Sequence, residues 1–137
     1  MEKTFAIIKP DAVGRGLAGD IIKRILGSGL KIRGMRLMHL SQGQAERFYE
    51  VHKARPFYGD LCKYMTSGPV VVMCLEGDKA ITRWRDLMGA TDPAKAAAGT
   101  IRKDFGENIE RNAVHGSDAP ETAAQEIPFF FSNLDLV

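Results

Sequence analysis

Short apolar stretches alternate along the chain with segments whose apolar residues recur at helical spacing. Residues 4–8, 31–40 and 70–75 have the length of β-strands. Residues 70–75 (VVVMCL) are apolar on both faces, which predicts a central strand covered on both sides, or covered by a neighbouring subunit. A short last strand is expected just before His115. The sequence therefore predicts four β-strands.

Helical spacing of apolar residues predicts the elements between these strands. A first helix is expected between residues 17 and 26, ended by Gly27 and Gly29. Ser41 and Gln44 form a capping box for a helix that must stop before Pro56, and a short helix follows at about residues 57–65.

Acidic residues mark the expected starts of the last two helices. Asp78 is placed to cap a helix with Trp84 in its buried stripe. Asp118 and Glu121 form a second capping box, with Pro120 in the first turn of the last helix.

Residues 89–111 show little periodicity and several Gly or Pro stops, and a long irregular segment in a compact domain is usually functional or disordered. The resulting order, β, α, β, αα, β, α, loop, β, α, predicts an α+β sandwich in which helices pack on one face of an antiparallel sheet.

Composition narrows the class of protein. A chain of 137 residues with 45% hydrophobic residues predicts one domain over residues 1–137. A net charge of +2 is too small to indicate a nucleic-acid or membrane surface. No apolar run resembles a signal peptide or a membrane span, so we expect a cytoplasmic protein, and Cys62 and Cys74 are expected to be reduced packing residues.

Residues 14–19 (GRGLAG) match the glycine pattern of dinucleotide-binding proteins. That pattern also requires an acidic residue about 20 positions further on, where this chain has His39. Glycines that ease a turn into a helix explain the match better. A dinucleotide-dependent oxidoreductase is retained only as a rival hypothesis.

The candidate chemistry lies around His115 in the stretch NAVHGSD. A lone histidine is more often structural, and so is each cationic residue taken singly. Arginine, however, is suited to phosphate because its planar fork donates two parallel hydrogen bonds. If they converge on an imidazole, the following residues would form a phosphate cradle: Lys9, Arg85, Thr91 and Arg102. The residues alone thus indicate a possible phosphotransfer histidine.

Five motifs in order give the chain a resemblance to nucleoside diphosphate kinases over its whole length: TFAIIKPDAV, HKARPFY, MTSGPVV, GATDPAKAAAGTIR and NAVHGSD. The resemblance implies a ferredoxin-like βαββαβ core with added helices, and a homo-oligomer, either tetramer or hexamer. It also implies Mg²⁺-dependent exchange of the γ-phosphate between nucleoside triphosphates such as ATP or GTP and nucleoside diphosphates. No protein ligand to the metal, no obligatory nucleic acid and no membrane are expected.

By this resemblance His115 is the nucleophile of a ping-pong reaction and carries the phosphate between two half-reactions. An imidazole suits this role because its ordinary pKa of about 6.5 leaves much of it uncharged near neutral pH. Ser117 and Glu126 would orient the ring, and Tyr49 would lie next to it.

The resemblance also assigns the nucleotide contacts. Arg85, Thr91 and Arg102 would hold the phosphates. Lys9 would reach the ribose hydroxyl and the transferring phosphate, and Asn112 the 3′ hydroxyl. Phe57 and Ile109 would sandwich the base, which implies little base selectivity because every base has a flat face to stack. His39 and His52 are expected to be structural.

Two points stay open. A catalytically silent nucleotide-binding regulatory module would have the same fold. In addition, Pro128 lies where the last helix of the family usually continues, so that helix is expected to kink or stop shortly after Glu126.

Overall fold

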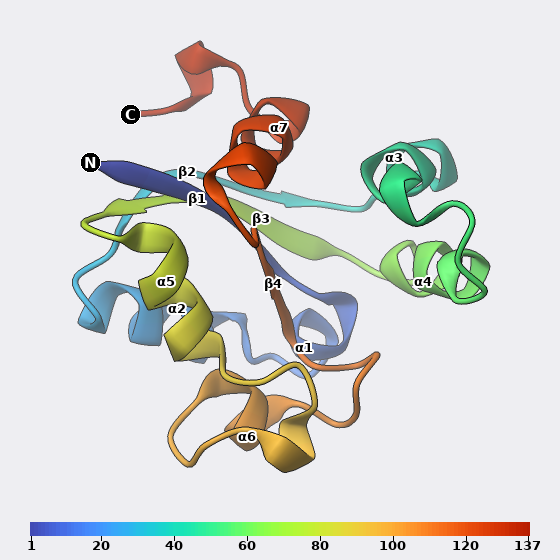
Figure 1. Cartoon of the computed structure of the whole chain (residues 1–137), viewed down its shortest axis with the longest axis horizontal. Helices are drawn as coiled ribbons and strands as arrows, with labels where there is room; N and C mark the ends of the chain where they lie inside the picture. Colours follow the sequence, from blue (N-terminus) through green and yellow to red (C-terminus); the bar gives the residue numbers. More distant parts are fainter.

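A computed structural model describes all residues, 1–137, and contains the predicted four strands (Figure 1). The elements follow one another in this order: β1 (Glu2–Ile8), α1 (Pro10–Gly14), α2 (Ala18–Gly27), β2 (Lys31–Met38), α3 (Gln42–Phe48), the 3-10 turn η1 (Glu50–His52), α4 (Tyr58–Met65), β3 (Val70–Gly77), α5 (Ala80–Met88), η2 (Pro93–Lys95), α6 (Ile101–Phe105), β4 (Val114–Gly116), α7 (Pro120–Phe130) and η3 (Asn133–Asp135).

The sheet is antiparallel throughout, with the strand order β2-β3-β1-β4. β1 and β3 are the central strands, and Phe5 lies opposite Cys74 in their register. β4 pairs with β1 so that His115 lies opposite Ile7. Because residues that face each other across a ladder share one face of the sheet, His115 projects from the same face as Ile7.

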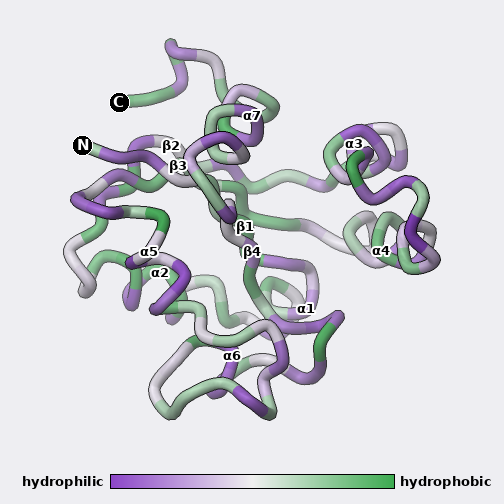
Figure 2. Tube along the Cα trace, viewed as in Figure 1, coloured by the Kyte–Doolittle hydropathy of each residue, from purple (hydrophilic) through white to green (hydrophobic).

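Helices cover both faces of this sheet, so the prediction of helices on one face is wrong. On one face, residues such as Ile8 and Met73 pack against α2 and α5. On the other face, Phe5 and Cys74 pack among residues of α3, α4 and α7. Figure 2 shows the hydrophobic residues of the central strands between these layers. The two-sided apolarity of β3 is explained by this double cover, and the α+β ferredoxin-like class is confirmed.

Both cysteines are buried and unpaired, as expected. None of the helices is long and apolar enough to cross a bilayer.

The predicted helix starts are partly confirmed. The Ser41 hydroxyl accepts a hydrogen bond from the Gln44 N–H at 3.1 Å, and the Ser41 N–H donates to Gln44 Oε1 at 2.8 Å, so this capping box is present. Asp78 does not cap α5. Instead Lys79 precedes that helix in a left-handed conformation (φ 51°), and the Glu2 carboxylate accepts from the Ile81 N–H at 2.8 Å.

The capping box predicted from Asp118 and Glu121 is also wrong. The hydroxyl of Thr122 accepts from the N–H groups of Asp118 and Ala119 at the start of α7. The Asp118 carboxylate makes no capping hydrogen bond and pairs with Arg85 instead.

α7 continues through Pro128 to Phe130, so it does not stop shortly after Glu126. The N–H of Phe131 donates to the Ile127 carbonyl at 2.9 Å, which keeps the turn around the proline closed. Glu126 therefore lies inside a helix.

Residues 89–111 are less irregular than expected, because they contain η2 and α6. The glycine pattern at 14–19 spans the junction of α1 and α2, not of a strand and a helix: Gly14 ends α1, Gly19 lies in α2, and Gly16 in the turn between them has a positive φ (75°).

Candidate active site

A cleft of about 970 Å³ opens between α4 and the segment that runs from the end of α5 to β4. All but two of the predicted site residues line it: Lys9, Tyr49, Phe57, Arg85, Thr91, Arg102, Ile109, Asn112 and His115. The other two do not line the cleft: Glu126 is hydrogen-bonded to His115, and Ser117 is hydrogen-bonded to Glu126. A cleft of this size is typical of small-molecule sites.

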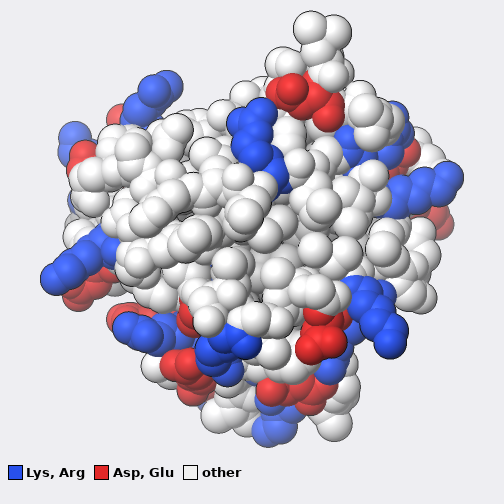
Figure 3. All heavy atoms as spheres, turned by 180° about the vertical axis from the view of Figure 1, so that it is seen from behind, with Lys and Arg blue, Asp and Glu red and all other residues white.

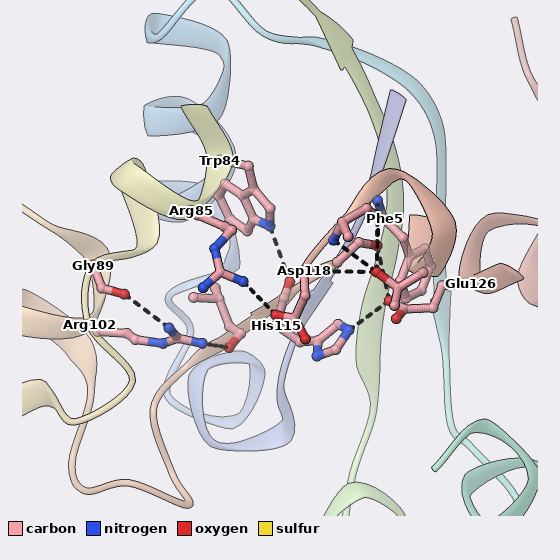
Figure 4. A network of polar contacts seen from close by, with 12 residues as sticks. Phe5, Trp84, Arg85, Gly89, Arg102, His115, Asp118 and Glu126 are labelled. Carbon is pink, nitrogen blue, oxygen red and sulfur yellow. Dashed lines mark hydrogen bonds and ion pairs between the residues drawn. The ribbon is translucent and has the colours of Figure 1, made fainter. Parts of the chain in front are cut away.

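His115 lies in the middle of β4, and a hydrogen bond to Glu126 fixes the orientation of its ring. Its Nε2–H donates to Glu126 Oε1 at 2.9 Å, and Figure 4 shows Glu126 on one side of the ring and Arg85 and Arg102 on the other. Phe48 contacts the imidazole edge to face, with ring centroids 5.7 Å apart. A carboxylate can only accept a hydrogen bond, so Nε2 carries the hydrogen and Nδ1 keeps a free lone pair.

The same carboxylate oxygen of Glu126 accepts a second hydrogen bond, from Ser117 Oγ at 3.1 Å. Ser117 is fully buried, and its Oγ accepts from the Phe5 N–H of the central strand at 3.3 Å. These two hydrogen bonds connect α7 to β1 through Ser117. The orientation of the imidazole therefore depends on a helix and a strand together.

Gly116, next to His115, faces the opposite side of the sheet, where α5 lies against it. A Cβ atom at this position would lie 2.6 Å from the Trp84 ring and from the Met88 methyl group. Trp84 also donates from Nε1 to the His115 carbonyl at 3.2 Å (Figure 4). The glycine in the HGSD stretch is thus required by packing against α5.

Arg102 reaches the cleft from α6 and is largely buried. Its guanidinium donates to the carbonyls of Gly89 at 3.0 Å and Val114 at 2.9 Å, while its Nε has no hydrogen-bond partner. Burial, followed by the like charge of Arg85, lowers the pKa of Arg102 to about 10. Arg102 therefore stays cationic at neutral pH and has donor capacity left.

Arg85 projects from α5 and pairs with Asp118, with 2.5 Å between Nη1 and Oδ1. Both side chains are exposed, so the pair is weak and can exchange partners at little cost.

Lys9 directly follows β1, precedes α1, and is almost fully buried in the lining of the cleft. Its Nζ donates to Asn112 Oδ1 at 2.8 Å. Asn112 in turn donates from Nδ2 to the carbonyls of Thr91 at 3.1 Å and Ile109 at 2.9 Å. Asn112 thus holds together the lysine and two parts of the long segment.

Phe57 and Ile109 lie at the mouth of the cleft and remain partly exposed, at 44% and 58%. The ring of His52 lies between those of Phe57 and Tyr49, with centroids 5.4 Å and 6.5 Å away. His52 also lines the cleft, so it supports the aromatic wall there.

Tyr49 is buried, and its hydroxyl has no hydrogen-bond partner. Burial and then the nearby Glu126 carboxylate raise the pKa of Tyr49, so its hydroxyl keeps its proton and can donate to a bound group. A buried hydroxyl without a partner is unusual, and since Tyr49 lines the cleft, its hydroxyl is placed to donate to a ligand there.

Several cleft residues were missed by the sequence reasoning: His52, Asp60, Leu61, Tyr64, Glu110 and Asp118. Asp118 belongs to the NAVHGSD motif, but its expected role as a helix cap hid its contact with Arg85. The others carry no local signal, because their positions follow from how α4 meets the long segment.

The cationic side chains around His115 favour an anionic ligand at that end of the cleft. Lys9, Arg85 and Arg102 converge near His115, whereas the chain contains no cluster of three or more His, Cys, Asp or Glu residues that could hold a metal ion. His115 has one free ring nitrogen, lies near these cations and is oriented by Glu126. A histidine in this setting can accept a phosphoryl group.

Comparison with known proteins agrees with a phosphoryl-transfer site. The family model described as nucleoside diphosphate kinase matches residues 2–136. Nucleoside diphosphate kinases of Geotalea uraniireducens and Geobacter sulfurreducens are 62% and 60% identical over 137 residues, covering 100% of each chain.

Solved structures agree in fold. A crystal form of the Aquifex aeolicus nucleoside diphosphate kinase has a TM-score of 0.97 and 42% identity, and the alignment covers 99% of both chains. The Halobacterium salinarum enzyme in complex with CDP has a TM-score of 0.95 and 43% identity, covering 99% of this chain and 91% of that one. The chain belongs to the nucleoside diphosphate kinase family.

Proposed function

We propose that the cleft carries out the reaction of the family, with His115 as the carrier of the phosphate. The chain transfers the terminal phosphate of a nucleoside triphosphate to a nucleoside diphosphate. The observation that carries the assignment of His115 is its hydrogen bond to Glu126 through Nε2, which leaves Nδ1 unbonded beside the cationic side chains.

In the first half-reaction the lone pair of Nδ1 attacks the γ-phosphorus. A bond from nitrogen to phosphorus forms, the bond from phosphorus to the β-phosphate oxygen breaks, and the nucleoside diphosphate leaves with those electrons. A second nucleoside diphosphate then attacks the phosphohistidine in the reverse direction. Glu126 stabilises the positive charge that the ring acquires, because it accepts the Nε2 hydrogen throughout.

Arg85, Arg102 and Thr91 bind the phosphates in this proposal. Phosphoryl transfer passes through a loose transition state, so positioning and charge stabilisation supply most of the catalysis. Arg102 is held by two carbonyls before any ligand arrives, whereas Arg85 must exchange Asp118 for a phosphate. Lys9 contributes a further positive charge and reaches the ribose hydroxyl and the transferring phosphate, while Asn112 reaches the 3′ hydroxyl and Tyr49 donates its free hydroxyl.

The base stacks between Phe57 and Ile109 at the mouth of the cleft. Both side chains are partly exposed, so they offer flat or aliphatic surface without a set of hydrogen bonds that would select one base. This arrangement supports low base selectivity. The CDP in the Halobacterium salinarum structure is a pyrimidine nucleotide bound to a relative of this chain.

Magnesium fits this site as part of the nucleotide. The residues proposed to bind the phosphates are cationic or hydroxyl-bearing, and Asp118, one of the acidic residues that line the cleft, is paired with Arg85. When bound, the ion would neutralise charge on the β and γ oxygens. We propose that the phosphates, and not protein side chains, supply most of its ligands.

We also propose that the chain works as a homo-oligomer. β2 is an edge strand of the sheet, and its apolar residues Met35 and Leu37 are exposed. Such an edge commonly pairs with another chain.

Incubation with γ-labelled ATP tests the assignment of His115. We expect one label per chain that is stable to alkali and lost in acid, as a phosphoramidate is. A His115→Ala variant should bind nucleotide and take up no label, and Ser117→Ala should still be labelled. Nucleotide binding without label in the unaltered protein would indicate a silent regulatory module instead.

A further inference from the structure

The ion pair between Arg85 and Asp118 lies within the proposed phosphate site, although one of its partners is an anion. Both side chains line the cleft together with His115, and Arg85 Nη1 lies 2.5 Å from Asp118 Oδ1 (Figure 4). The Asp118 carboxylate accepts no other hydrogen bond. A phosphate that binds Arg85 Nη1 must therefore displace a carboxylate that already occupies it.

A carboxylate resembles a phosphate as a partner for arginine. Both groups present two oxygens that match the planar fork of the guanidinium. Asp118 thus occupies Arg85 in the way that a phosphate would. The side chain of Asp118 is 79% exposed and that of Arg85 is 49% exposed. An ion pair as exposed as this one is weak, so the more highly charged phosphate displaces the carboxylate.

The start of α7 fixes the place to which the carboxylate returns. The backbone N–H groups of Asp118 and Ala119 donate to Thr122 Oγ1 at 3.1 Å and 3.0 Å. Because the Asp118 carboxylate takes no part in this cap, the backbone stays in place whether or not Arg85 is bound. Only an exposed side chain has to rotate, so Asp118 can release and recapture Arg85 without a rearrangement of α7.

A second arginine makes a carboxylate useful in the empty cleft. Burial and then the charge of Arg85 lower the pKa of Arg102 to about 10, and the charge of Asp118 acts in the opposite direction. Asp118 therefore offsets the repulsion between the two arginines until a phosphate takes over this role. Of the acidic residues that line the cleft, only the last in this list is paired with one of these arginines: Asp60, Asp86, Glu110 and Asp118.

We propose that Asp118 is a positioning residue that competes with the phosphates for Arg85. It holds the guanidinium while the cleft is empty and takes it back as the product leaves. This competition weakens the binding of nucleoside diphosphates and triphosphates, and it speeds the release of the nucleotide product in each half-reaction. Asp118 touches no reacting atom in this role. The inference rests on the proposed role of Arg85 as a phosphate-binding residue.

Equilibrium binding of ADP without Mg²⁺ tests the competition, because the protein alone then contacts the phosphates. Asp118→Asn keeps the size of an exposed side chain and loses its charge. We expect this variant to bind ADP about two- to fivefold more tightly, the range for an exposed ion pair, and to release it more slowly by a similar factor in stopped flow. Adenosine, which has no phosphate, should bind both proteins equally.

Asp86→Asn is the matched control. Asp86 follows Arg85 on α5 and lines the same cleft without an ion pair, so its replacement measures the effect of removing one negative charge near a site for anions. It should tighten ADP binding by less than about twofold. In an Arg85→Met background, Asp118→Asn should have no larger effect than this control, because the contested guanidinium is absent.

The direction of the change decides the outcome, since loss of a group that merely supports the site would weaken ADP binding. Unchanged or weaker binding in Asp118→Asn would overturn the inference and leave the proposed function intact. So would equal tightening in Asp86→Asn, or tightening that persists in the Arg85→Met background. Unimpaired ADP binding by Arg85→Met alone would instead refute the assumed role of Arg85.

Discussion

At the scale of single residues, one oxygen of Glu126 accepts hydrogen bonds from both His115 Nε2 and Ser117 Oγ. A Glu126→Gln variant keeps the size of the side chain and loses the negative charge that stabilises the charged ring. We expect phosphorylation of His115 to slow by about tenfold or more, with nucleotide affinity little changed. Rapid-quench measurement of the first half-reaction would show this.

The control for that variant is Glu121→Gln, on the same helix but exposed, which should phosphorylate at the normal rate. Normal phosphorylation of Glu126→Gln would mean that the carboxylate does not support the ring during the reaction.

Lys9 should reduce the stability of the fold at neutral pH. Burial, followed by the positive charge of Arg102, lowers its folded pKa from the ordinary 10.5 to about 8, so between these values the unfolded chain binds more protons and stability rises with pH. We expect Lys9→Met to be more stable than the unaltered protein at pH 7 by on the order of 1 kcal/mol, since the loss of the hydrogen bond to Asn112 offsets part of the gain. Urea unfolding at several pH values measures the difference.

That difference should shrink as the pH rises above the folded pKa of Lys9, because the unaltered protein then loses the buried charge. A constant or growing difference would contradict the assigned pKa shift.

At the scale of elements, α7 contains a proline that an ideal helix would exclude. Pro128 removes one backbone donor and crowds the preceding turn, although the helix continues to Phe130. Pro128→Ala should restore that donor and raise the free energy of unfolding by roughly 1 kcal/mol, the gain being limited by the greater freedom of the unfolded chain.

Thermal unfolding measures the gain from Pro128→Ala, and phosphorylation of His115 serves as its control. We expect activity to be unchanged because Glu126 precedes the proline. A clear loss of activity would show instead that Pro128 helps to place Glu126.

The elements also show which parts of the fold a sequence can predict. The strands, the stripe of Trp84 and the Ser41 capping box follow from neighbours in the chain, and the structure confirms them. The start of α5 could not be predicted in this way, because the first turn of α5 is capped by Glu2, from a strand distant in the sequence, and not by the expected Asp78. The same holds for Tyr64, whose contact with Asp11 depends on how two helices meet.

Most of the site could be predicted because its motif residues are recognisable by resemblance. Nearly all of these residues line one cleft. The resemblance implied that Ser117 and Glu126 orient the His115 ring, but not which ring nitrogen Glu126 binds, and the hydrogen bond from Lys9 to Asn112 was not predicted; both depend on distances of a few tenths of an ångström between elements.

At the scale of the whole molecule, the charged side chains do not cover the surface evenly. Figure 3 shows a face on which most charges lie toward the rim and the centre is uncharged. On β2, the Val137 N–H donates to the Arg33 carbonyl, so the tail covers the beginning of this edge strand. The remainder, with Met35 at 55% and Leu37 at 68% exposed, is available to another copy of the chain.

A Leu37→Lys variant should therefore lower the mass of the assembly, because a charge on an edge strand opposes pairing with a second strand. Light scattering at a range of protein concentrations measures this. Exposed Val51, far from β2 in the sequence, gives the matched control as Val51→Lys. If Leu37→Lys assembles as the unaltered protein does, subunits meet through another surface.

The hydrogen bonds of Arg102, Lys9 and Asn112 are all made to other groups of the protein. An enzyme of this kind releases one nucleotide and binds another in every catalytic cycle. We expect the arrangement to favour this exchange, because these side chains need not be ordered again when each nucleotide binds. We expect this prior arrangement to lower the conformational entropy lost on each binding event. The partly exposed Phe57 and Ile109 hold the base by stacking alone, which we expect to favour product release.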